Sequence, residues 1–319
     1  MRDPTCVVTG GAGFIGSHLV DALVRTGRTV RVLDDFSTGR VTDLRAAMRS
    51  GRVEIVRGSV KDLKTVTKTL QSARVVFHLA ALTDHRVAVN NPLLLNATNV
   101  TGTLNLLNVA VKSHVECFVF ASSAAVYGES GHPSMAENAP ANPINPYGAS
   151  KLASESYCRA FQRTYGVDTV CLRYFNVYGS RQRASGEAAV IPEFLKKIRE
   201  RKPLRIRGTG HQVRDFIHVD DVVNATLLAA EKQRASGRVL NVGTGTPTSI
   251  LALVKQLLVL TGQARLRKLH LSSRPGDIMR SCAETSKASE ILGFCPKVSL
   301  EDGLRSLIVS ENTLARPGS

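Results

Sequence analysis

The sequence lacks the features that mark several classes of protein. Its 319 residues contain no run of 18 or more apolar residues, so a membrane-spanning helix is not expected. A strand-like segment starts at residue 5, which leaves no room before it for a signal peptide. Low-complexity tracts and internal repeats are also missing. With 43% hydrophobic residues, the chain can build a large core, in one α/β domain or in two lobes that share a cleft.

Cysteines at the spacing of metal or redox motifs are missing as well. The chain has six cysteines, none of them in a C-x-x-C motif, and several lie in apolar runs such as VECFVF. We therefore expect buried, reduced thiols in a cytoplasmic protein and no metal site.

Acidic residues are scarce, since 26 Asp and Glu oppose 42 Lys and Arg and give a net charge of +16. Basic residues are densest in KKIRERKPLRIRG, residues 196–208. No aromatic residues interleave with them, which disfavours nucleic acid as a partner and favours a solvent-exposed helix face followed by a strand. A basic chain also suits ligands that carry a diphosphate.

Apolar segments alternate with helical ones through the first half of the chain. Strands are predicted within residues 5–10, 29–35, 53–60, 74–81, 115–128 and 167–179, and helices within 14–27, 99–113 and the stretch after Pro146. Apolar strands separated by helices indicate an α/β fold with a doubly wound parallel sheet that is covered on both faces.

The pattern changes after about residue 180. Residues 181–194 are loop-like, a basic helix follows, and the later strands are short and interrupted. This predicts a smaller C-terminal α/β lobe over the carboxyl edge of the sheet. We expect a nucleotide-binding domain over residues 1–180, with return segments near 211–245, and a substrate lobe formed mainly by residues 181–319.

A glycine-rich turn, VVTGGAGFIGSHL, joins the first strand to the first helix. Glycines at positions 10, 13 and 16 let the backbone approach a pyrophosphate, whose charge the helix N-terminus stabilises. Asp34 ends the next strand, about 20 residues on, where a carboxylate bonds the adenosine ribose hydroxyls. Since that carboxylate would repel a 2′-phosphate, the predicted cofactor is NAD rather than NADP.

With these motifs in place, the sequence resembles the extended short-chain dehydrogenase/reductases, specifically the UDP-glucose and UDP-N-acetylglucosamine 4-epimerases. The resemblance covers nearly the whole chain and rests on TGGAGFIGSH, LDDFSTG, FHLAA, NVTGTLNLL, SSAAVYG, YGASK, RYFNVYG, RDFIHVDD, NVGTG and RPGDI. It implies a Rossmann-like NAD domain, a smaller lobe for a UDP-sugar, and a homodimer paired through two long helices.

The resemblance assigns catalysis to Ser123, Tyr147 and Lys151. Tyr147 and Lys151 form a Y-x-x-x-K motif, whose spacing puts both side chains on one helical face. The Lys151 ammonium and the positive nicotinamide would lower the pKa of Tyr147, so that the phenol acts as acid and base on the sugar O4. Lys151 would also hold the nicotinamide ribose, and the Ser123 hydroxyl would bond O4 and relay the proton.

The other site residues are implied in the same way. Cofactor contacts are expected from Gly10, Gly13, Phe14, Ile15, Gly16, Asp34, Asp35, Ser37, Thr38, Gly39, Ser59, Val60, Leu79, Ala80, Ala81, Asn99, Tyr147, Lys151 and Tyr174. Ser59 stands where the family often has Asp, which leaves Asp62 as a nearby candidate for the adenine.

Substrate contacts are implied for Ser123 and Tyr147 and for a further set in the second half of the chain. Asn176, Arg214 and Arg274 match residues that bind the diphosphate, and Asp277 matches the acid that contacts the uridine ribose. Ala189 and Val190 belong to AAVIP, which matches the uracil loop. Ser281 matches a gate position near the sugar C2 group, where a large Tyr excludes an N-acetyl group; a serine leaves room for it.

Several reactions share the oxidation at C4. The 4,6-dehydratases follow their catalytic Thr with Asp and Glu, and the uronate decarboxylases usually keep the Glu. Here Ala124 and Ala125 occupy these positions, so epimerisation is favoured. UDP-glucuronate 4-epimerases use an Arg at position 183 to meet the C6 carboxylate, but tend to have Thr at position 176; for Arg183 we favour a surface position. A non-catalytic protein that binds NAD or nucleic acid is a remote alternative.

Overall fold

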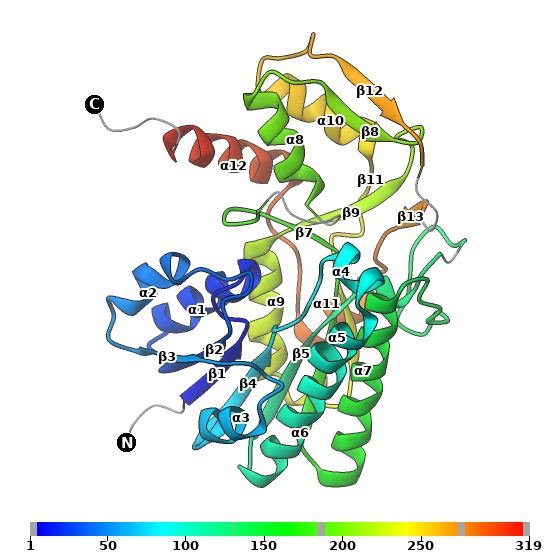
Figure 1. The fold of residues 1–319 in the computed structure, drawn as a ribbon. Coiled ribbons are helices and arrows are strands. Elements are labelled where there is room, and N and C mark those ends of the chain that lie inside the picture. The colour runs from blue at the N-terminus through cyan, green and yellow to red at the C-terminus, as the bar shows by residue number, and fades with distance from the viewer. Residues whose placement is uncertain (1–4, 130, 184–188, 274–277, 315–319) are drawn as a thin grey trace.

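The computed structural model describes residues 5–129, 131–183, 189–273 and 278–314, and it confirms the predicted fold class. A doubly wound parallel sheet, Rossmann-like in its strand order, lies below a smaller C-terminal α/β lobe (Figure 1). No helix of the described residues is long and apolar enough to cross a bilayer.

The main sheet has seven strands in the order β10-β6-β5-β4-β1-β2-β3, and every neighbouring pair is parallel. Its first six strands in sequence correspond to the predicted ones. The strands are β1 (Thr5–Thr9), β2 (Val30–Asp34), β3 (Val53–Arg57), β4 (Ala73–His78), β5 (Cys117–Ser123), β6 (Asp168–Tyr174) and β10 (Val239–Val242).

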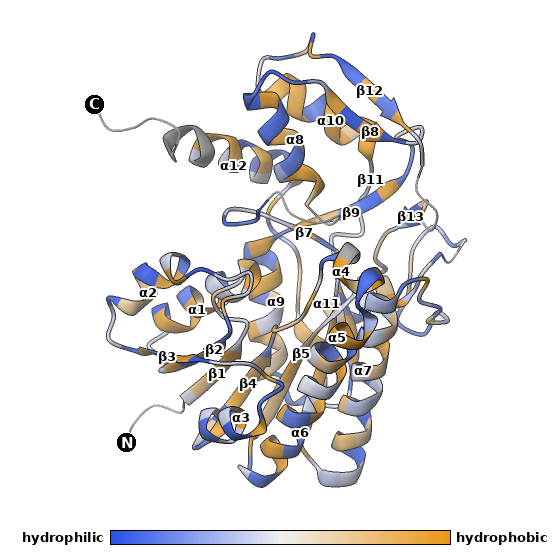
Figure 2. Cartoon of the chain, in the orientation of Figure 1, coloured by the Kyte–Doolittle hydropathy of each residue, from blue (hydrophilic) through white to orange (hydrophobic). Residues whose placement is uncertain are grey.

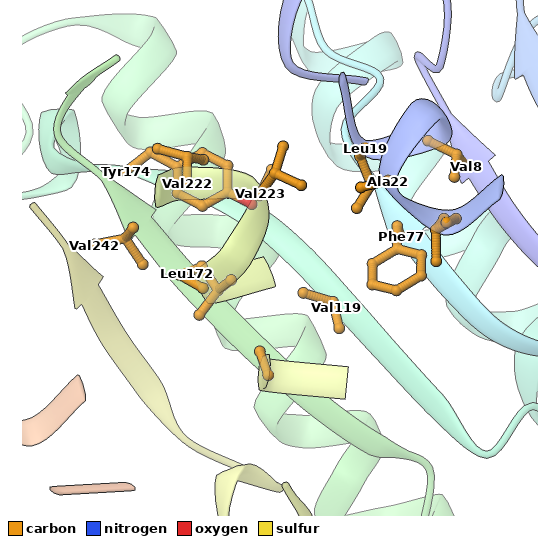
Figure 3. Close-up of a cluster of buried hydrophobic side chains, with 14 of the residues drawn as sticks. Val8, Leu19, Ala22, Phe77, Val119, Leu172, Tyr174, Val222, Val223 and Val242 are labelled. Carbon is orange, nitrogen blue, oxygen red and sulfur yellow. The ribbon is translucent and has the colours of Figure 1, made fainter. Parts of the chain in front are cut away.

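Helices cover both faces of this sheet, as the uninterrupted apolar strands require. One face packs on α1 (Phe14–Arg25), α9 (Val219–Glu231) and α11 (Ser286–Leu292), where Val8 and Phe77 contact Leu19 (Figure 3). The other face packs on α3 (Leu63–Leu70), α6 (Gly102–Lys112) and α7 (Pro146–Tyr165). Figure 2 shows hydrophobic residues along the central strands and hydrophilic residues on the outward sides of the helices.

Short elements connect these layers. They are the 3-10 turns η1 (Val41–Leu44), η3 (Ala124–Val126) and η4 (Gln233–Ala235), the helices α2 (Arg45–Met48), α4 (His85–Asn90) and α5 (Pro92–Asn96), and the π-helical η2 (Ala97–Thr101). The single helix predicted within residues 99–113 therefore begins with a π-helical turn, and its α-helical part starts at Gly102.

The smaller lobe has its own apolar core, which includes Phe194, Leu253 and Leu257. Its elements are β7 (Asn176–Tyr178), α8 (Val190–Arg199), β8 (Leu204–Arg207), β9 (Val213–His218), β11 (Pro247–Ser249), α10 (Ile250–Leu260), β12 (Lys268–Leu271), β13 (Arg280–Ser281) and α12 (Leu300–Leu314). Strand β9 pairs with β7, β11 and β13, and β8 pairs with β12.

Two expectations for this region need correction. Residues 167–179 were expected to form one strand, but they supply β6 to the main sheet and β7 to the smaller one, with Phe175 between them. Residues 181–194 were expected to be a loop, yet α8 already starts at Val190 because Ile191, Phe194 and Leu195 bury one apolar side. The division into domains at about residue 180 stays a prediction.

Candidate active site

The glycine-rich turn lies against the end of β4 with no room for side chains. Gly10 has a φ of +68°, and a Cβ on it would lie 2.7 Å from the Ala80 nitrogen. A Cβ on Gly16 would lie 2.2 Å from the Gly10 carbonyl oxygen. The turn is therefore a bare backbone surface at the N-terminus of α1, which fits a dinucleotide pyrophosphate.

Asp34 ties this turn to the end of β2. The carboxylate is 7% exposed, and it accepts hydrogen bonds from the backbone nitrogens of Ala12 (2.9 Å) and Phe36 (2.8 Å). Burial raises the pKa of Asp34, while the two hydrogen bonds lower it. Each carboxylate oxygen has a second lone pair, so the group can hold the turn and still accept from ribose hydroxyls.

Asp62 is held at the start of α3, and the adenine contact considered for it stays a prediction. It caps α3, where its oxygens accept from the Lys64 nitrogen (3.0 Å) and the Thr65 hydroxyl (2.5 Å). These hydrogen bonds lower the pKa of Asp62. Its geometry is that of an ordinary N-cap.

A buried histidine that sequence reasoning missed links the strands beneath the dinucleotide turn. His78 is 1% exposed, and its two ring nitrogens bond the hydroxyls of Thr9 (2.7 Å) and Thr103 (2.9 Å). Burial lowers the pKa of His78 to about 3, so the ring is neutral. Because the Thr103 hydroxyl donates to the Asn99 carbonyl (2.5 Å), we assign the ring proton to Nε2.

The Asn99 side chain, predicted to contact the cofactor, is engaged within the protein. Its amide donates to the Leu82 carbonyl (3.1 Å) and the Ser150 hydroxyl (3.0 Å), and its oxygen accepts from the Leu82 nitrogen (2.8 Å). Asn99 thus fastens the segment after β4 to α7 directly beside Lys151.

Local signals place the start of α7 next to the end of β5. Asn145 is the N-cap and accepts from the Gly148 nitrogen (2.8 Å), while Pro146 occupies the first helical position. A Cβ on Gly148 would lie 2.4 Å from the Ala125 carbonyl oxygen, so only glycine allows this approach. It brings Tyr147 and Ser123 together.

The three predicted catalytic residues do converge. The Ser123 hydroxyl lies close enough to the Tyr147 phenol to lower its pKa, and it accepts a hydrogen bond from the Ala125 nitrogen (3.1 Å). Lys151 is 3% exposed; its ammonium donates to the Ala121 carbonyl (2.8 Å) and lies 5.9 Å from the centre of the Tyr147 ring.

The pKa of Tyr147 is displaced in the direction opposite to the one expected from Lys151. Burial raises it to about 12, and the hydrogen bond with Ser123 offsets only part of this shift. Burial also lowers the pKa of Lys151 to about 8, although nearby Glu155 raises it. Desolvation therefore outweighs the effect of the ammonium in the chain by itself.

Behind Lys151 lies a buried ion pair that sequence reasoning also missed. Arg173 donates to both carboxylate oxygens of Glu155 (2.9 and 2.8 Å), and the Ser122 hydroxyl donates to the same carboxylate (2.5 Å). The Arg173 guanidinium also lies 4.6 Å from the centre of the Tyr127 ring. The pair raises the pKa of Arg173.

The described substrate candidates gather on neighbouring strands of the smaller lobe. Arg214 on β9 is the register partner of Ser281 on β13, which is 6% exposed. On β7, Asn176 donates to the Asp215 carbonyl (3.3 Å). Ala189 is buried just before α8. Arg274 and Asp277 lie outside the described residues.

Asp215 was not anticipated from the sequence, yet it joins the two sheets. Its fully buried carboxylate accepts from the nitrogen and hydroxyl of Thr244 (2.9 and 2.6 Å) and from the nitrogens of Gly245 (2.9 Å) and Ala283 (3.1 Å). Both oxygens of this buried carboxylate are hydrogen-bonded. Through them, Asp215 on β9 holds the NVGTG turn after β10 and the residue Ala283 that follows β13.

The part of the chain that the structure describes contains no cluster of three or more His, Cys, Asp or Glu residues able to hold a metal ion. The polar groups at the carboxyl ends of the main-sheet strands are instead backbone amides, hydroxyls, a phenol and an ammonium. Such a set suits a dinucleotide and an alcohol substrate.

Known proteins share this arrangement. Residues 6–243 match the family model of the NAD dependent epimerase/dehydratase family. A putative UDP-glucose 4-epimerase of Methanocaldococcus jannaschii is 37% identical over 95% of this chain and 96% of its own length.

Solved structures agree over the full length. The UDP-glucose 4-epimerase of Thermotoga maritima, crystallised with UDP-glucose, has a TM-score of 0.92 and 38% identity, covering 98% of this chain and 100% of that one. The UDP-N-acetylglucosamine 4-epimerase of Methanobrevibacter ruminantium M1 has a TM-score of 0.92 and 35% identity, with 98% and 100% coverage.

Proposed function

Because the chain belongs to the NAD dependent epimerase/dehydratase family, we propose that it is an NAD-dependent 4-epimerase of UDP-hexoses. Its cofactor is NAD, which would supply reversible hydride transfer at the sugar C4. The observation that carries the proposal is the convergence of three side chains: Lys151 lies 5.9 Å from the centre of the Tyr147 ring, and the close approach of Gly148 to Ala125 holds Tyr147 beside Ser123.

In the proposed mechanism, Tyr147 takes the proton of the O4 hydroxyl while C4 loses its hydride, which leaves a 4-keto sugar. Ser123 bonds O4 and passes the proton to the Tyr147 phenolate, which becomes the phenol. The ammonium of Lys151 stabilises the phenolate and holds the nicotinamide ribose. After the 4-keto sugar rotates, Tyr147 would return the proton to O4 as the other face of C4 is reduced, so no net oxidation would occur.

The residues after Ser123 support epimerisation rather than elimination of water. Ala124 and Ala125 form the turn η3, and Ala124 is 8% exposed. Their methyl groups supply no proton donor or acceptor where the dehydratases that the sequence resembles have Asp and Glu. A 4,6-dehydratase or decarboxylase is therefore the weaker candidate.

The contacts of Arg183 favour a sugar substrate whose C6 group carries no charge. Its guanidinium pairs with Asp43 (2.7 Å) and donates to the Thr38 carbonyl, both in the segment after β2. An arginine already neutralised there is a poor partner for a sugar carboxylate, so UDP-glucuronate is disfavoured. With Ser281 at the gate position, we propose UDP-glucose/UDP-galactose and the corresponding N-acetyl pair as substrates.

We further propose the homodimer that the resemblance implies, paired through two long helices, with α7 as one of them and the short helices α4 and α5 beside it. Val89, Leu93 and Tyr157 on these helices are 52%, 82% and 40% exposed, and the three helices lie side by side (Figure 1). A second copy would cover these apolar side chains, since a twofold interface pairs one patch with itself. Sedimentation of the wild type and of Leu93→Glu tests this; a monomeric wild type contradicts it.

The cysteines favour the cytoplasm as the compartment. All six are free, and five of them are buried. Buried thiols with no disulfide suit a reducing environment.

The decisive experiment is NMR product analysis with a panel of UDP- and dTDP-sugars, after bound NAD has been verified. We expect interconversion of C4 epimers of UDP-hexoses by the wild type and none by Tyr147→Phe, which should still bind NAD. A product that has lost water or CO₂, or no turnover of any UDP-hexose, would contradict the proposal.

A further inference from the structure

Residues 180–183, here called the strap, run from β7 to the NAD half of the molecule. The Ser180 carbonyl accepts from the His18 ring (3.0 Å), and Arg181 pairs with Asp21 (2.7 Å). His18 and Asp21 both belong to α1, whose N-terminus carries the glycine-rich turn. The strap therefore lies against the helix that faces the pyrophosphate site.

The last strap residue, Arg183, reaches the loop after β2. One guanidinium nitrogen bonds Asp43 in η1 (2.7 Å), and the other donates to the Thr38 carbonyl. That loop contacts the glycine-rich turn in its own right, because the Arg40 nitrogen donates to the Ala12 carbonyl (3.0 Å). Arg183 thus fixes the expected adenosine-ribose loop from the substrate side.

The centre of the strap carries unfavourable features. Arg181 has a φ of +65°, a left-handed conformation that is costly for a residue with a side chain. Among the described residues, two buried side-chain polar atoms have no hydrogen-bond partner, Arg181 Nη1 and Gln182 Oε1, and both lie in the strap. Unsatisfied buried polar atoms destabilise the closed conformation.

The ion pairs that hold the strap closed are individually weak. The side chains of Arg181 and Asp21 are 27% and 22% exposed, and those of Arg183 and Asp43 are 31% and 20% exposed. Partly solvated pairs contribute little each. A segment that is strained at its centre and fastened at its ends by weak contacts can open and close as a unit.

We propose that the strap is a latch for NAD, in which Arg183 is a positioning residue that slows release of the cofactor by fixing the Thr38 loop. The latch is independent of which sugar is the substrate. It also accounts for a cofactor that stays in place through repeated turnover in the proposed reaction, since opening requires both ion pairs to separate.

The test measures cofactor release without any sugar. Wild-type protein is loaded with NADH, and the fall in NADH fluorescence after addition of excess NAD⁺ gives the release rate. We expect Arg183→Gln and Asp43→Asn each to accelerate release about five- to tenfold, the scale of one ion pair with its hydrogen bond. Because both changes break the contact between Arg183 and Asp43, the double variant should release NADH no faster than Arg183→Gln alone.

Two controls separate the latch from general damage. Arg45→Gln removes one exposed positive charge from the neighbouring helix α2 and should leave release unchanged. The exchanged pair Arg183→Asp with Asp43→Arg should restore slow release. Release by Arg183→Gln within twofold of the wild type, additive effects in the double variant, or an exchanged pair no slower than the single variants would each overturn the proposal.

Discussion

Glu155 and Arg173 form a bidentate ion pair, and Glu155 lies one helical turn after Lys151 on α7. Their side chains are 3% and 6% exposed, and the carboxylate also accepts from the hydroxyl of Ser122, the neighbour of Ser123 in the chain. The pair therefore connects the helix that carries Tyr147 to strands β5 and β6. The pair supports the candidate site from behind.

Replacing Glu155 with Gln should destabilise the protein by about 3–5 kcal/mol, because it leaves the Arg173 charge buried without a counterion. Urea unfolding of the NAD-loaded protein measures this. A matched control is Glu116→Gln, since the Arg74–Glu116 pair is 54% exposed on both sides and should contribute no more than about 1 kcal/mol. Equal losses for the two variants would contradict the argument.

Burial of Lys151 predicts a pH-dependent stability. Its pKa falls from 10.5 to about 8 on folding, so the folded state disfavours the ammonium, and this cost is present in full below about pH 8. Lys151→Met removes the cost and should gain up to roughly 3 kcal/mol at pH 7. The advantage should shrink as the pH rises from 8 to 10.5, where the unfolded wild type also loses its proton. Urea unfolding of both proteins across this pH range measures whether Lys151→Met is the more stable one and whether its advantage shrinks as the pH rises.

Tyr147 should titrate differently with the two redox forms of the cofactor. The chain itself raises its pKa to about 12, so the positive charge of oxidised nicotinamide has to supply the lowering needed for catalysis. We expect the phenolate absorbance near 295 nm to appear at lower pH with NAD⁺ than with NADH. Tyr147→Phe should lack this component, and identical titrations for the two forms would exclude such a role for the nicotinamide.

Ser281→Tyr should narrow the substrate range. Ser281 is 6% exposed on β13 and is the register partner of Arg214, so a phenol there would fill the space proposed for the sugar C2 substituent. We expect kcat/KM for UDP-N-acetylglucosamine to fall at least about tenfold, and that for UDP-glucose to change little. Ser281→Ala serves as the control for loss of the hydroxyl alone. Equal losses on both substrates would argue against a gate.

Local patterns in the sequence predicted much of this structure. The apolar strands, the glycine turn and the four-residue spacing of Tyr147 and Lys151 each depend on neighbours in the chain, so their signal is local. Asn145, as the N-cap, and Pro146, at the first helical position, likewise mark the start of α7.

What the sequence did not predict depends on partners that are distant in the chain. Arg183 and Asp43 are 140 residues apart, and Arg173 and Glu155 lie on different elements. Nothing local identifies such a partner, so Arg183 was expected at the surface and Glu155 was not considered. The division of 167–179 into two strands has the same origin, because the break at Phe175 depends on pairing with Ile217 and its neighbours on β9.

The passage from β6 to β7 through Phe175 alone has a mechanical consequence. Since the chain goes directly from the main sheet into the smaller one, and Asp215 bonds the turn after β10, the two sheets are joined at two points. In the proposed epimerisation, the 4-keto sugar would therefore have to rotate between two sheets whose positions are coupled.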